Sequence, residues 1–209
     1  MAKLGLISPA IPFELALALG YSPSLILPSG VPISRAEGLL PRNFCAYLKL
    51  LAASLLQDNR WEAILVPLED ESPRRFFEVL EEMLPGRIFA LELPLRKDEA
   101  GARRLAHLFR ALADQLGREF NPDALEEAIV LGNELRRAVK EARDLWVSGL
   151  MDSLFFWDLR VKALTSSPPE AISLLRGACA ESRRSSGSKP GIMLSGGVTV
   201  KRALVELVE

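Results

Sequence analysis

The first 95 residues alternate short apolar runs with helix-like segments, and this alternation limits the fold more than any other feature of the chain. Four apolar runs without hairpin signals between them predict strands at 3–8, 24–30, 63–68 and 87–94. The segments between them predict helices at 12–20, 41–57 and 73–84. Short, continuously apolar strands separated by helices are typical of a parallel sheet that is buried on both faces. The sequence therefore predicts an α/β fold, with a Rossmann-like parallel sheet and helices on both faces.

Local signals support three of these helices. Pro12 and Gly20 enclose the first helix with the usual proline at its start and glycine at its end. Ser72-Pro73 opens the helix after the third strand. The helix predicted at 41–57 carries one buried apolar stripe, formed by Phe44, Cys45, Leu48, Leu51, Ala52 and Leu55.

The rest of the chain changes character. Residues 96–184 form a helical region, with helices predicted at 99–117, 123–146 and 150–164 and a fourth that opens at the capping box of Ser167 and Glu170. After a polar linker, residues 191–197 predict a strand and the last residues a helix. Three segments are therefore expected: 1–95, 96–184 and 185–209. We expect the last to open a truncated second α/β domain, with an apolar surface that is exposed or buried against another copy of the chain. Alternatively, its strand joins the first sheet.

Composition argues against several classes of protein. The 26 basic and 27 acidic residues nearly balance, so no basic stripe for nucleic acid is expected. No apolar run reaches the roughly 18 residues that a membrane span needs. Two cysteines, Cys45 and Cys179, fit a reduced cytoplasmic protein.

Acidic side chains occur where parallel sheets place their ligands. Glu69, Asp70 and Glu71 follow the third strand, and Glu14 lies early in the first helix. The three loop acids could hold a hard cation or contact a substrate, or they could cap the next helix, whose dipole favours acids there. Glu14 is a candidate substrate-binding residue, and stabilisation of the helix start is the simpler alternative.

The remaining candidates are single residues. Cys45 is either a core residue of its helix or a metal ligand, and Cys179 is expected to serve packing. His107 has no suggested catalytic partner, so we expect a surface or packing role. The tryptophans are expected to be core or interface anchors: Trp61, Trp146 and Trp157.

Several stretches in order resemble one family. They are "IPFELALALGYSPSLIL", "LLPRNFCAYLKLL" around Cys45, "ELP" at 92–94, "GREFNPDALEEAIVLGNELRRAV" with its Asn133 and Arg136, and "KPGIMLSGG". Together they resemble the D-component family of 2-hydroxyacyl-CoA dehydratases and benzoyl-CoA reductases, over essentially the whole chain.

The resemblance implies a two-domain α/β subunit with a helical insertion, paired with a related subunit. It implies a 4Fe-4S cluster between the domains and an ATP-dependent activator that delivers one electron to form a ketyl radical from a CoA thioester. The family's cysteine ligands come from the helix matched by Cys45, from the loop after the third strand, and from the second domain.

The chain departs from that pattern in the loop after the third strand. The family's Pro-x-x-Cys-Asp is replaced by Pro67-Leu68-Glu69-Asp70-Glu71, so Asp70 or Glu69 occupies the cysteine position. Carboxylates favour hard cations, whereas iron–sulfur clusters are held mainly by thiolates. We therefore expect no cofactor in the isolated chain and a non-catalytic or partner subunit with a degenerate iron–sulfur site. The partner would be a related dehydratase-like subunit or a second copy in a homodimer. The alternative is a working half-enzyme, completed by another chain that shares a 4Fe-4S cluster.

Overall fold

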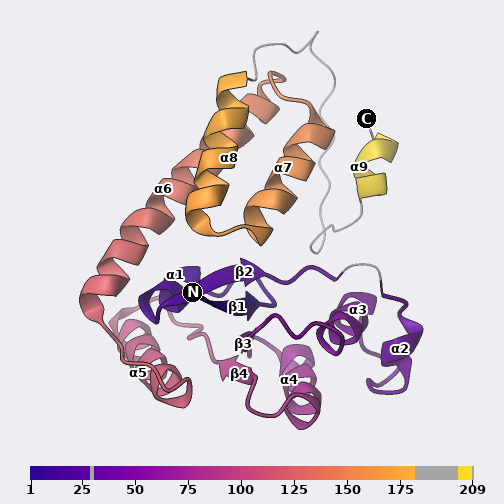
Figure 1. Cartoon of the computed structure of the whole chain (residues 1–209), viewed down its shortest axis with the longest axis vertical. Helices are drawn as coiled ribbons and strands as arrows, with labels where there is room; N and C mark the ends of the chain where they lie inside the picture. Colours follow the sequence, from indigo (N-terminus) through magenta and orange to yellow (C-terminus); the bar gives the residue numbers. More distant parts are fainter. Residues whose placement is uncertain (29–30, 182–201, 209) are drawn as a thin grey trace. The chain divides into compact units, whose positions relative to one another are not determined.

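A computed structural model describes residues 1–28, 31–181 and 202–208, and the chain forms two compact units (Figure 1). The first unit is Met1–Ala128 and the second is Ile129–Glu209. The division predicted from the sequence, with boundaries after residues 95 and 184, stays a prediction. Within the described residues, no helix has both the length and the apolar character needed to cross a membrane.

A four-stranded parallel sheet forms the centre of the first unit. Its strands are β1 (Ala2–Leu6), β2 (Tyr21–Leu25), β3 (Ala63–Pro67) and β4 (Ile88–Leu91), arranged in the order β2-β1-β3-β4. Every pair is parallel. All five residues of β3 are buried, as expected of an inner strand with helices on both faces. The predicted α/β fold with a parallel sheet is confirmed.

The edge strand β2 contains a proline, Pro23. The Ile26 N–H donates to the Leu6 carbonyl at 2.8 Å, and alternate residues of β2 face β1 in the same way. By this alternation the ring nitrogen of Pro23 faces outward, where no ladder hydrogen bond is lost. A proline at this position also interrupts the row of free N–H groups to which another strand could add.

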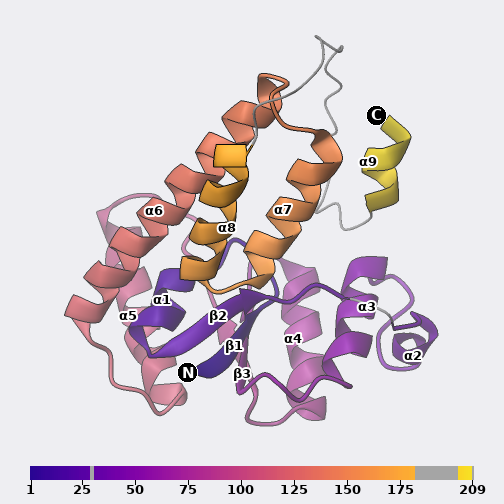
Figure 2. The ribbon, with the colours of Figure 1, turned by 45° about the horizontal axis from the view of Figure 1, so that its top comes forward.

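The helices of the first unit cover both faces of the sheet. α1 (Phe13–Ala18) and α5 (Glu99–Gln115) lie on one side, and α3 (Ala46–Leu55) and α4 (Glu71–Met83) lie on the other (Figures 1 and 2). The reversal of strand order explains this division. The chain moves one way from β1 to β2 and the opposite way from β2 to β3, and right-handed crossovers then place the helices on opposite faces.

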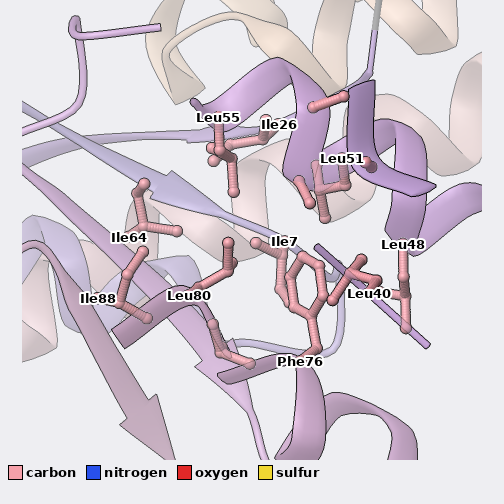
Figure 3. Packing of buried hydrophobic residues seen from close by; sticks show 14 of the residues in the cluster. Ile7, Ile26, Leu40, Leu48, Leu51, Leu55, Ile64, Phe76, Leu80 and Ile88 are labelled. Atoms are coloured by element: carbon pink, nitrogen blue, oxygen red, sulfur yellow. The ribbon is translucent and has the colours of Figure 1, made fainter. Parts of the chain in front are cut away.

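The larger described core lies between the sheet and the α3 and α4 helices. Phe76 of α4 is fully buried, and its ring points toward Ile7 and Leu40 (Figure 3). Leu80 of the same helix packs in this cluster with Ile64 of β3. The core therefore fixes α4 against the sheet through residues four apart on one helix face.

Helices make up the described part of the second unit. The long helix α6 (Pro122–Val147) begins in the first unit, and α7 (Ser153–Thr165), α8 (Pro168–Glu181) and α9 (Arg202–Val208) follow it. Asp152 caps α7, and the predicted capping box of α8 is confirmed because Glu170 accepts hydrogen bonds from the Ser167 N–H and hydroxyl. Small and apolar side chains form the core of this unit: Ala138, Ala142, Met151, Leu159, Leu175 and Ala178.

The largest corrections to the predicted elements concern β2 and α3, and one short helix was missed. β2 covers Tyr21–Leu25 rather than 24–30, because Gly20, with φ +77°, turns the chain from α1 directly into the strand. α3 begins at Ala46 rather than at residue 41, because the residues before it form turns. The short helix α2 (Ser34–Glu37) was not predicted. The predicted strand at 191–197 and the apolar surface expected near 185–209 fall almost entirely outside the described residues.

We expect Phe76→Ala to lower the free energy of unfolding of the first unit by about 3–5 kcal/mol, because it leaves a cavity in a fully buried site. Phe77→Ala is the matched control, since Phe77 lies on the same helix and is only partly buried. Urea unfolding followed by circular dichroism measures both variants. Equal losses for the two would contradict the central place given to Phe76 in this core.

Candidate functional site

The carboxyl edge of the sheet is the candidate site. β1 has β2 on one side and β3 on the other, so the segments that leave β1 and β3 run to opposite faces of the sheet. Open α/β sheets bind ligands at such a switch point. This topology brings the start of α1, with Glu14, and the loop after β3, with Glu69 and Asp70, to the same edge.

The acids after β3 serve first as the start of α4. The Asp70 carboxylate accepts a hydrogen bond from the Ser72 N–H at 2.8 Å, which makes Asp70 the N-cap of the helix. Glu71 forms an ion pair with Arg75 one turn later, at 2.9 Å, and Glu69 is exposed. α4 therefore begins at Glu71, two residues before the predicted first residue, Pro73. The capping interpretation of these acids is confirmed for Asp70.

Glu14 is a buried acid in the first turn of α1. Glu14 is only 4% exposed, although an ionised carboxylate is costly to remove from water. The N-cap of α1 is Pro12, whose side chain makes no capping hydrogen bond. A negative charge in the first turn of a helix interacts favourably with the helix dipole. Its burial and its place at the switch point are compatible with both predicted roles, and substrate binding by Glu14 stays a prediction.

Cys45 lies outside the helix stripe to which the sequence assigned it. It is the N-cap of α3 and is exposed, whereas Leu48 and Leu51 of the predicted stripe are buried. The prediction that Cys45 belongs to the buried stripe was wrong, because the helix starts one residue after it. Burial raises the pKa of the Tyr47 hydroxyl, and the nearby Cys45 thiol raises it further. Because Cys45 is exposed, its sulfur is accessible from outside the protein.

Cys179 and Trp61 pack in the interior of the protein, and His107 lies on its surface. Cys179 is half-buried against the core of the second unit, as predicted, and burial together with the charge of Glu141 raises the pKa of its thiol. His107 is exposed on α5. Trp61 is buried, and its indole N–H donates to Asp58 at 3.1 Å.

Trp146 is an aromatic anchor at the end of α6. It stacks on Phe156 with a centroid distance of 4.8 Å, and its indole N–H donates to the Ser153 hydroxyl at 3.0 Å. These contacts join the end of α6 to the first turns of α7.

No metal centre is assembled within residues 1–28, 31–181 and 202–208. There, no three side chains of His, Cys, Asp or Glu are grouped so that they could hold an ion. Cys45, Glu69 and Asp70 do not form such a group.

The sequence analysis missed a cationic face on α6. Arg136, Lys140 and Arg143 are spaced i, i+4 and i+7, which places them on one side of the helix, and all three are exposed. That spacing is visible in the sequence. Acids are interspersed among these residues, and Asp144 lies one turn after Lys140 and 3.4 Å from Arg143.

Comparison with known families gives one finding. The model of the family described as 2-hydroxyglutaryl-CoA dehydratase, D-component, matches residues 10–209. A comparison with curated proteins finds no match.

We expect Asp70→Ala to destabilise the first unit by about 1 kcal/mol, because it removes the cap of α4. Asp70→Asn keeps a capping oxygen and should cost less. Glu69→Ala is the control, since Glu69 is exposed and is not the cap. Chemical unfolding at pH 7 measures all three. A loss for Glu69→Ala as large as that for Asp70→Ala would show that the cap is not the source of the effect.

Proposed function

Since the chain belongs to the 2-hydroxyglutaryl-CoA dehydratase D-component family, we propose that it is a non-catalytic or partner subunit of this kind, with a degenerate iron–sulfur site. The observation that carries the proposal is the role of Asp70. The resemblance places a cysteine ligand at Asp70 or Glu69, and of these two carboxylates Asp70 caps α4. If Asp70 occupies the cysteine position, a side chain that caps its own helix replaces one that would bind iron.

The donor atoms fit a four-iron cluster poorly. Cys45 is an exposed thiol at a family ligand position, and Glu69 and Asp70 offer hard oxygen atoms. Cys179 belongs to the second unit and packs against its core. The described side chains therefore do not supply the set of thiolates that such a cluster commonly needs.

The exposure of Cys45 favours a second candidate function. A thiol at the N-cap of α3, free of the core, has the accessibility of a ligand that could complete a cluster with another chain. In that case the protein is the working half of a 2-hydroxyacyl-CoA dehydratase or benzoyl-CoA reductase-type enzyme. Glu14, buried at the switch point, would then contact the substrate.

Both candidate functions involve a partner. We propose a related dehydratase-like subunit or a second copy of this chain, and, for the half-enzyme, an ATP-dependent activator. Family membership supports association of this kind.

We expect anaerobic reconstitution of the isolated chain with iron and sulfide to give no stoichiometric cluster. The absorbance near ~400 nm, where thiolate-bound iron absorbs, should stay low, and iron analysis after gel filtration should find less than one cluster per chain. A stable cluster in the isolated chain would overturn the degenerate-site proposal.

Repeating the reconstitution with a related subunit present separates the two candidate functions. The half-enzyme predicts a cluster that forms only in the mixture, is lost in Cys45→Ser and is kept in Cys179→Ser, the matched control in the second unit. A mixed complex without a cluster supports the non-catalytic partner. The absence of any complex argues against both.

A further inference from the structure

The outer side of β4 presents main-chain hydrogen-bonding groups. Within the described residues, β4 pairs with β3 alone, so its other side is an edge of the sheet (Figure 1). The Ile64 N–H donates to the Arg87 carbonyl at 2.8 Å, which shows that Arg87 faces β3. Alternate residues of a strand face the same neighbour, so Phe89 also faces β3. The N–H and C=O groups of Ile88 and Ala90 therefore point outward, away from the sheet.

The side chains of β4 are covered less completely than those of the inner strand. Phe89 and Ala90 are partly exposed, whereas every residue of β3 is buried. β4 is nonetheless fixed in the core, because Ile88 is buried in the same cluster as Leu80 of α4. The edge is therefore a strand that the fold already holds in place, with apolar side chains still accessible beside its outward main-chain groups.

The two edges of the sheet differ in how they are protected. On β2, the outward ring nitrogen of Pro23 interrupts the row of N–H groups. β4 has the sequence Ile-Phe-Ala-Leu, so this edge contains neither a proline nor a charged residue. Proline and charge are devices by which proteins prevent an exposed edge from pairing with another chain. The contrast indicates that β4 is the edge at which pairing is allowed.

A second copy of β4 matches this edge across a two-fold axis. In an antiparallel pair centred on Phe89, Ile88 of each copy lies opposite Ala90 of the other, and both pairs are of the hydrogen-bonded kind. All outward N–H and C=O groups of these residues are then satisfied, in about four hydrogen bonds. Phe89 faces its own counterpart in the non-hydrogen-bonded pair between them, where aromatic side chains on adjacent strands stabilise the pairing.

We propose that two copies of this chain associate by antiparallel pairing of their β4 edges, which joins two four-stranded sheets into one. The inference deepens the partner proposal above, on which it rests for the expectation of a partner, and it commits to a second copy. The match of Phe89 with itself favours that choice, since it needs two identical strands. The paired strands are short, so we expect a weak dimer with a dissociation constant of about 1–100 μM.

Sedimentation equilibrium of the full chain, over concentrations that span this range, tests the association itself. The expected result is a reversible equilibrium between monomer and dimer, because one isologous contact closes after two copies. A chain that stays monomeric about tenfold above this range would overturn the proposal.

Hydrogen exchange of single amides locates the contact in the unaltered protein. The Ile88 and Ala90 amides should exchange about tenfold more slowly in the dimer than in the monomer, because each donates to the second copy. The Tyr21 and Leu25 amides point outward on β2 and are the matched control, whose exchange should not change. Full protection of Ile88 and Ala90 in the monomer would show that the same chain covers this edge, and would overturn the proposal.

A pair of charge variants tests the register. Phe89→Glu and Phe89→Lys each place like charges opposite one another at the two-fold axis, so each variant alone should be monomeric. An equimolar mixture of the two should form a dimer again, because opposite charges then face each other. Leu95→Glu is the control, since Leu95 follows β4 and is 93% exposed, and it should leave the dimer unchanged.

Two results would contradict this register. They are a dimer that persists in Phe89→Glu, and a mixture that stays monomeric although circular dichroism shows both variants to be folded. If a variant fails to fold, hydrogen exchange of the unaltered chain still decides the proposal.

These measurements need neither iron nor turnover, so they are separate from the test of the degenerate site. A monomeric chain without a cluster would refute this inference and keep the degenerate site. A dimer through β4 that holds a stoichiometric cluster would do the reverse.

Discussion

The pairing of β1 with β3 is the contact on which the first unit depends. It joins residues almost 60 positions apart, with Leu4, Gly5 and Leu6 beside Ala63, Ile64 and Leu65. Because β1 already pairs with β2 on its other side, this contact creates the reversal of strand order. The division of the helices between two faces, the switch point at the carboxyl edge and the enclosure of β3 all follow from it.

Close packing at this centre also explains why a glycine lies within β1. A methyl group added at Gly5 would come within 2.4 Å of the end of the Ile26 side chain and within 3.1 Å of the Trp61 ring. Ile26 and Trp61 belong to the same core as α3 and α4. A glycine at position 5 therefore leaves room for Ile26, which follows β2, and Trp61, which precedes β3, to pack over β1.

The candidate residues of the first unit have three different surroundings. Asp70 is satisfied by the start of α4, whereas Glu14 is an acid kept nearly free of solvent and Cys45 is a thiol kept exposed. The degenerate site that we propose for this member of the D-component family depends on this distribution.

The sequence alone determined the class of fold and the type of almost every element. Alternating apolar runs predicted the four parallel strands, and the capping box of Ser167 and Glu170 predicted the start of α8. Local chemistry sufficed in these places because strand burial and helix capping depend on residues close in sequence.

Tertiary structure decided the order of the strands, the burial of Glu14 and the exposure of Cys45. An apolar stripe at helical spacing includes Cys45 on paper, but the turns after α2 delay the helix until Ala46 and leave the thiol outside the core. Glu14 is polar and would be exposed on an isolated helix, yet packing of α1 in the folded unit covers it. Spacing along the chain shows which residues can share a side of a helix, and only the packing of distant segments fixes which side is covered.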